Sequence, residues 1–221
     1  MRLVRSPGLT STQLNLTVKG YEENDLPALS DVSGCIGFVL GENHAAGNFA
    51  TISFWDSLEA MEDSKPVALE ARERAAIASD ARLAPIFDQY EVTFQQSLDT
   101  FAGVGPGSYS AFRLVRFEGL SGEGMERTAD AYRAQDLEQI ERTPGFAGIV
   151  LGENRDEGTL TTISFWITKD AMRASEESFL TAQGRSVAAA EASHADALVD
   201  RLQIRLAARL DRLQEHATTA P

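Results

Sequence analysis

The chain has 221 residues, enough for one large domain or two small ones. Its formal net charge of −13 argues against nucleic acid and anionic membranes as partners, because both carry negative charge themselves. The single cysteine, Cys35, excludes an intrachain disulfide. No apolar signal core stands at the start, and no run approaches the roughly 18 apolar residues of a membrane-spanning helix, so we expect a cytoplasmic protein.

Two long segments of the sequence match each other. Gly37–Ser64 and Gly148–Ser175 align without a gap at an offset of 111 residues, and 15 of the 28 aligned positions are identical. The same offset relates Arg2–Arg5 to Arg113–Arg116. We therefore predict a tandem duplication of one module.

The first half reads, in chain order, as a strand, a helix, two strands, a helix and a strand. The strands are expected near Arg2–Arg5, Cys35–Gly41, Phe49–Trp55 and Tyr90–Ser97, and the long second helix over Leu58–Arg82. The first helix, within Thr12–Ser30, is the least clear element, because Gln13–Val18 alternates like a strand and Pro27 interrupts its end. Pro66 is expected to split the second helix or to begin its second piece.

Residues 99–110 hold three glycines and a proline and are predicted to form a surface linker.

The second half repeats this order with clearer signals. Its predicted elements are strands over Phe112–Glu118, Phe146–Gly152, Thr159–Trp166 and Leu202–Leu210, and helices over Glu123–Arg142 and Asp170–Leu198, the latter broken near Gly184. An amphipathic helix is the alternative for Leu202–Leu210.

The order β-α-β-β-α-β predicts an α+β fold of two ferredoxin-like repeats. We place repeat 1 at 1–98, repeat 2 at 111–210 and a tail at 211–221.

The third strand of each half carries two different sets of side chains. In the first half one set is apolar, Ile52 and Phe54, and the other is mixed, Thr51, Ser53 and Trp55. We expect the apolar set beneath the helices and the mixed set on the open face of the sheet. Because tryptophan is costly to leave in water, the two open faces are expected to pack sheet to sheet as an intramolecular dimeric α/β barrel.

A mixed polar and aromatic interior is typical of a small-ligand cavity. The side chains expected to line it are the mixed sets of both third strands and one arginine of the last strand: Thr51, Ser53, Trp55, Thr162, Ser164, Trp166 and Arg205. Arg205 alternates with apolar residues, as does Gln203, and a buried arginine needs a partner or an anionic ligand. The alternative for the two tryptophans is that they plug the barrel.

Several motifs of the second half resemble a known family. Thr143–Gly148 (TPGFAG), Leu-Gly-Glu-Asn at 151–154, Ile163–Trp166 (ISFW) and Asp170–Met172 (DAM) are similar to the antibiotic biosynthesis monooxygenase family of the dimeric α/β-barrel superfamily. The resemblance covers most of 111–210 and, more loosely, 1–98. It implies a fused dimer, with cofactor-independent oxygenation of phenolic or quinol substrates as one activity found among relatives.

The residues that relatives use for chemistry do not match. Quinone-forming oxygenases have an asparagine four residues before the strand-end tryptophan and a tyrosine six after it, where this chain has Thr51 and Met61 in one half and Thr162 and Met172 in the other. Haem-degrading relatives have a histidine ten residues after the tryptophan, where this chain has Lys65 and Glu176.

The remaining candidates for chemistry are few. His44, in the first hairpin turn, and His194, late in the second long helix, are candidate bases, with solvated side chains as the alternative. Cys35 is expected to be a packed thiol, and the repeated Glu-Asn pairs at 42–43 and 153–154 to be hairpin-turn chemistry. No histidine cluster or paired cysteine points to a metal, and no cofactor is expected.

Two functions remain open on this basis. One is a protein that binds a small aromatic or apolar ligand, as a cofactor-independent monooxygenase if it is catalytic. The other is a non-catalytic ligand-binding or stress-response module of the same fold. Either way, one half could keep a site while the other serves as scaffold, and the fused pseudo-dimer could form a further homodimer.

Overall fold

A computed structural model describes residues 1–79, 86–96, 111–189 and 197–208. The predicted linker at 99–110, the tail at 211–221 and the candidate base His194 lie outside these ranges. Within them, no helix is both long enough and apolar enough to cross a membrane. The described residues form two compact units, one built around the first half of the sequence and one around the second.

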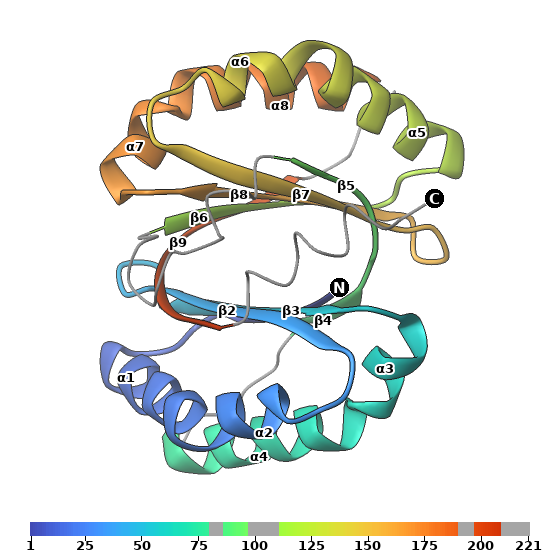
Figure 1. The fold of residues 1–221 in the computed structure, drawn as a ribbon. Coiled ribbons are helices and arrows are strands. Elements are labelled where there is room, and N and C mark those ends of the chain that lie inside the picture. Colours follow the sequence, from blue (N-terminus) through green and yellow to red (C-terminus); the bar gives the residue numbers. More distant parts are fainter. Residues whose placement is uncertain (80–85, 97–110, 190–196, 209–221) are drawn as a thin grey trace. The chain divides into compact units, whose positions relative to one another are not determined.

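Unit 1 is an antiparallel sheet with helices on one face (Figure 1). Its strands are β1 (Arg2–Ser6), β2 (Cys35–Asn43), β3 (Asn48–Trp55) and β4 (Ile86–Gln89), hydrogen-bonded in the order β4-β1-β3-β2. Its helices are α1 (Ser11–Gly20), α2 (Leu26–Ser30), α3 (Leu58–Asp63) and α4 (Lys65–Ser79), with a π-helical turn η1 (Tyr21–Asp25) between α1 and α2.

Unit 2 repeats this arrangement (Figure 1). Its strands are β6 (Ala111–Phe117), β7 (Phe146–Asn154) and β8 (Thr159–Trp166), and its helices are α5 (Gly122–Ala131), α6 (Leu137–Glu141), α7 (Lys169–Ala174) and α8 (Glu176–Ala189), with the π-helical turn η3 (Tyr132–Asp136) before α6. The predicted α+β class and the ferredoxin-like order of elements are confirmed.

The segment 12–30 is helical, as predicted. Thr10 caps α1 through a reciprocal capping box with Gln13, in which each side chain accepts from the backbone N–H of the other residue. Leu14 and Val18, one turn apart, are both buried against the sheet. Pro27 lies in the first turn of α2, where its missing N–H costs no helical hydrogen bond.

The second helix of the second half is broken at a different place from the one predicted. Gly184 lies inside α8, and the break falls at Ser175, between α7 and α8. The hydroxyl of Ser175 bonds back to the Met172 carbonyl at 2.7 Å and also accepts from Arg113 at 3.0 Å, which fixes this turn. A lone glycine inside a helix costs only about 1 kcal/mol, so α8 continues through it.

Each unit takes a fifth strand from the other half of the sequence, which the sequence analysis did not anticipate. The predicted strand Tyr90–Ser97 contains one strand, β5 (Glu91–Gln96), which pairs with β7 in unit 2. The strand that pairs with β1 is β4, which lies just before the predicted range. The last strand, β9 (Ala197–Ala208), belongs to unit 2 up to Arg201, and from Leu202 onward to unit 1, where it pairs with β2. The hydrogen-bonding order of the strands is β4-β1-β3-β2-β9-β6-β8-β7-β5.

The assignment of strand faces in the sequence analysis was wrong. Trp55 packs in one cluster with Leu14 of α1 and Met61 of α3, so the mixed set of β3 lies beneath the helices. The indole N–H of Trp55 donates to Ser53, two residues earlier on the same face, at 2.9 Å, and so the mixed set satisfies its own polar group in the core. The apolar set lies on the other face, and Ile52 and Phe54 are also fully buried.

Unit 2 has the same orientation. Trp166 packs in a cluster with Met125 of α5 and Met172 of α7, and its indole donates to Ser164 at 3.0 Å.

Two glycines of unit 2 allow the stability cost of backbone strain to be separated from that of a steric clash when alanine replaces them. Gly145 and Gly119 both have positive φ, +85° and +71°, but a Cβ at Gly145 would lie 2.5 Å from the Ala171 Cβ, whereas nothing lies within 4 Å of one at Gly119. We expect Gly119→Ala to lower the free energy of unfolding by about 1 to 2 kcal/mol through backbone strain alone. Gly145→Ala should cost clearly more, measured by urea unfolding, and equal losses would contradict the packing described here.

Candidate functional site

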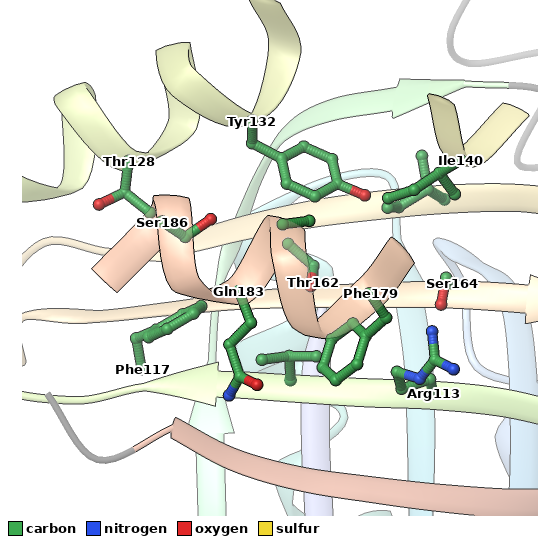
Figure 2. Close-up of a pocket in the computed structure, with 13 residues that line it drawn as sticks. Arg113, Phe117, Thr128, Tyr132, Ile140, Thr162, Ser164, Phe179, Gln183 and Ser186 are labelled. Atoms are coloured by element: carbon green, nitrogen blue, oxygen red, sulfur yellow. The ribbon is translucent and has the colours of Figure 1, made fainter. Parts of the chain in front are cut away.

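A small pocket lies between the sheet and the helices of unit 2 (Figure 2). Its volume is about 30 Å³. Its lining comes from β6, β7 and β8 on the sheet side and from α5, η3, α6 and α8 on the helix side: Arg113, Val115, Phe117, Thr128, Tyr132, Ile140, Ile149, Thr162, Ser164, Phe179, Ala182, Gln183 and Ser186.

The sequence-predicted residues Thr162 and Ser164 both line this pocket, though from the helix-covered face of the sheet. Trp166, next along the same face, is fully buried beside them. Phe146 packs edge-on against the Trp166 ring, with 5.5 Å between ring centroids. Trp166 therefore packs in the core beside the pocket and holds the Ser164 side chain through its indole N–H.

Among the described residues that line the pocket, Arg113 alone is cationic, and it is 3% exposed. It lies directly across from Ser164 in the β6–β8 register. Its guanidinium lies over the ring of Phe179 at 4.2 Å and over that of Trp166 at 5.7 Å. These contacts are cation–π interactions, which are strongest where water is excluded.

One nitrogen of Arg113, Nη2, makes all of the hydrogen bonds that the structure records for this side chain. Its Nη2 donates to the Met172 carbonyl at 2.8 Å, to Ser175 at 3.0 Å and to Glu176 at 3.2 Å. Its Nε is buried and has no hydrogen-bond partner among the described residues. Burial lowers the pKa of Arg113 to about 10, against the raising effect of Glu176, so the group is still cationic at neutral pH.

Tyr132 closes the pocket on the helix side (Figure 2). Burial, and then the charge of Asp136, raise the pKa of its phenol above the ordinary value, so the hydroxyl keeps its proton at neutral pH. Asp136 is fully buried, and its carboxylate is held by Arg185 of α8. π-Helical turns frequently mark functional sites, and η3 carries both residues of this arrangement.

Unit 1 has an arginine, a serine and a tryptophan in the same arrangement, but the apolar side chains around them differ. Arg2 lies over Trp55 at 5.7 Å and donates to Ser64 at 2.9 Å, as Arg113 does at the equivalent positions. Tyr21, the counterpart of Tyr132, packs its ring against Phe38 and Phe49, with centroids 6.2 and 6.0 Å apart.

Unit 2 has smaller side chains at these positions, Ile149 for Phe38 and Leu160 for Phe49, although Phe179 replaces the smaller Ala68. The two units therefore differ in their apolar side chains here and share the arginine, the serine and the tryptophan.

Arg113 and Tyr132 were missed as site residues by the sequence analysis. The available signal was their identity with Arg2 and Tyr21 at the repeat offset. It was overlooked because the wrong face of the sheet was assigned to the site.

The other sequence candidates lie at the hairpins. Arg205 was expected in a buried interior, but its side chain is 45% exposed and its Nη1 bonds Glu42 at 2.8 Å. His44 contacts the same carboxylate, with its Nε2 3.0 Å from Glu42 Oε1. Asn43 accepts from the amides of Ala45 and Ala46, which is the predicted turn chemistry. The buried state of Glu42 was not predicted.

Cys35 is buried, with its sulfur 4.0 Å from the Gly37 carbonyl oxygen. In the part of the chain that the structure describes, no cluster of three or more His, Cys, Asp or Glu side chains could hold a metal ion.

We expect Arg205→Gln to lower the free energy of unfolding by about 1 to 2 kcal/mol, because Glu42 is buried and would lose its arginine while keeping the contact with His44. The loss is modest for a buried charge because Arg205 is half exposed. Thr93→Val is the matched control, since Glu153 of unit 2 would lose the Thr93 hydrogen bond but keep Arg155. Equal losses in urea unfolding would contradict this account.

Glu176 should make stability depend on pH in the acid range. Burial acts to raise its pKa, but the hydrogen bond from Arg201 and the charge of Arg113 outweigh this and lower it below the usual 4.5. Such a carboxylate stabilises the fold above its unfolded-state pKa, and the contribution is lost as pH falls through the lower, folded-state pKa.

We therefore expect Glu176→Gln to be less stable than the wild type at pH 7, by about 1 kcal/mol or less because the group is partly exposed. The gap should close as pH drops below 4.5. A gap that stays constant across acid pH would contradict the ion-pair account.

No protein-family model matches the chain, and no curated protein matches it by sequence. Solved structures do share its fold. An anthrone oxidase-like protein matches with a TM-score of 0.67 at 15% identity, covering 94% of this chain and 92% of that one.

Two candidate monooxygenases also match. The one from Fusobacterium nucleatum has a TM-score of 0.63 at 10% identity, covering 93% of this chain and 92% of that one. The one from Lactobacillus acidophilus has a TM-score of 0.59 at 11% identity, covering 94% of each chain. At these identities the matches establish the fold, and they extend over nearly the whole chain.

Proposed function

We propose that the pocket of unit 2 binds a small aromatic or apolar molecule that carries one acidic oxygen. The observation that supports this most directly is Arg113, a buried cation beside apolar walls, with a partnerless Nε at the pocket. A charge-assisted hydrogen bond to an anionic oxygen is the interaction such a group lacks. Val115, Ile149 and Phe117 offer the apolar surface for the rest of the ligand.

The size of the pocket requires a side chain to move when a ring enters. A volume of about 30 Å³ is far below the roughly 150 Å³ of a cavity that holds benzene. Phe179 lines the pocket with its ring on Arg113, so its displacement would free space beside the guanidinium. A planar ligand would take over the same cation–π contact, so exchanging one ring for the other loses little energy.

Cofactor-independent oxygenation is the reaction class that we propose for a bound acidic substrate. Arg113 would stabilise the substrate anion, and the anion would react with O₂. Oxidation of a CH₂ group to a carbonyl releases four electrons, so O₂ places one oxygen atom in the product and the other in water, with no external reductant. The fold shared with an anthrone oxidase-like protein and candidate monooxygenases supports this class.

A non-catalytic binding module is the second candidate, and one observation favours it. The pocket lining contains no carboxylate or histidine among its described residues. Tyr132 keeps its proton at neutral pH, and so the pocket presents no ready general base. The oxygenase proposal therefore requires a substrate acidic enough to ionise in the field of Arg113.

Binding can be tested with a pair of ligands of equal size, benzoate and benzamide, in a Trp55→Phe variant, whose remaining tryptophan is Trp166. We expect benzoate to change the Trp166 fluorescence and to bind about ten-fold more tightly than benzamide, equivalent to about 1.4 kcal/mol. Arg113→Met should abolish the preference, whereas Arg2→Met, the matched change in unit 1, should keep it. Absence of binding by both ligands would overturn the proposal.

Catalysis has a separate readout. Oxygen uptake with anthrone, followed by electrode, should exceed the uncatalysed rate and fall in Arg113→Met but not in Arg2→Met. Ligand binding without any oxygen uptake would leave the non-catalytic module as the function.

A further inference from the structure

Each of the two exchanged strands, β9 in unit 1 and β5 in unit 2, runs past a buried hairpin carboxylate. Glu42 of β2 lies opposite Gln203 of β9, and Glu153 of β7 lies opposite Glu91 of β5, so the two carboxylates hold equivalent places in the two units. Glu42 is 3% exposed and Glu153 is 5% exposed. A carboxylate taken out of water this far is costly unless a positive or hydrogen-bonding partner accompanies it.

Each of these carboxylates has two partners, one from the exchanged strand and one from its own hairpin. Glu42 has Arg205 from β9 at 2.8 Å and His44 from its hairpin at 3.0 Å. Glu153 has the hydroxyl of Thr93 from β5 at 3.0 Å and Arg155 from its hairpin at 2.9 Å.

The arginine therefore comes from the strand in unit 1 and from the hairpin in unit 2. A guanidinium is charged at any pH that a protein meets, whereas an imidazole is charged only when protonated.

The arrangement gives each buried carboxylate one arginine, and only the observed pairing does so. If β9 met the hairpin of its own half, Glu153 would face Arg205 and Arg155 together. If β5 met the hairpin of its own half, Glu42 would face Thr93 and His44 and would have no arginine. Such like-with-like pairing becomes possible when two copies of the chain exchange strands, because each copy carries both strands and both hairpins.

We propose that the placement of Arg205, Thr93, His44 and Arg155 around Glu42 and Glu153 is a pairing code that directs each exchanged strand to the other half of the same sequence. The code acts mainly against wrong pairings. A like-with-like pairing leaves Glu42 buried without an arginine and sets two guanidinium groups against each other at Glu153. The partner recognised by each hairpin is thus the final strand of the opposite half, and not the final strand of its own half.

The code can be reversed without changing the composition of the protein. Exchanging the strand residues, in Arg205→Thr with Thr93→Arg, leaves Glu42 without an arginine. Exchanging the hairpin residues, in His44→Arg with Arg155→His, crowds two arginines at Glu42 and leaves none at Glu153. Combining all four changes restores one arginine to each carboxylate with the roles of the two units reversed.

We expect each double variant of the full-length chain to melt about 5 °C or more below the wild type, and the four-fold variant to recover most of that loss. Light scattering after gel filtration should show more large species in each double variant than in the wild type, and a return to the wild-type profile in the four-fold variant. Arg142→Thr, which removes an exposed arginine paired with an exposed carboxylate, should change neither measurement.

The pattern of recovery decides the outcome. If the double variants fail to fold but the four-fold variant folds, the code is supported, because only the combination supplies both carboxylates. If the losses of the two doubles add in the four-fold variant, or if the four-fold variant does not fold, the four residues act independently and the proposal is overturned.

Discussion

The indole N–H of a buried tryptophan needs a hydrogen-bond acceptor, and in both units the hydroxyl of the serine two residues earlier accepts this bond. The Ser164–Trp166 pair therefore lies on one face of β8 with its polar groups satisfied, and that face can be covered by helices. Arg113 of β6 lies opposite Ser164 in the strand register, so it lies beneath the same helices, with its guanidinium over the tryptophan ring. The position of the pocket follows from this one hydrogen bond and its neighbours.

Under the proposed function, Arg113 is the group that would select the ligand. Desolvation makes a buried cation unfavourable, and Glu176 accepts hydrogen bonds from both Arg113 and Arg201. In the proposed function, the buried cation in an otherwise apolar space favours a ligand that brings a negative oxygen. In unit 1 the equivalent arginine, Arg2, is present, and the ring of Tyr21 packs on Phe38 and Phe49. The apolar side chains near the two arginines therefore differ between the units.

The exchanged strands connect the two halves of the sequence within each unit. Because β9 completes the sheet that contains β2, and β5 the sheet that contains β7, each unit depends on both halves for its full set of strands. The buried carboxylates Glu42 and Glu153 lie where these strands pair, and a buried charge without a compensating partner lowers the stability of the fold.

The sequence by itself determined the order of elements, most of their bounds and the α+β class, because strand alternation, helix caps and breakers such as Pro27 act over short distances. It also proposed Thr162, Ser164 and Trp166 as site residues, but on the open face of the sheet, whereas the first two line a pocket on the helix-covered face. The tertiary structure alone decided which face of the sheet the helices cover, since an alternating strand presents two faces and local sequence does not say which is packed. It also decided where the chain divides between units, because hydrogen bonding of β5 and β9 to distant strands depends on contacts far apart in the sequence.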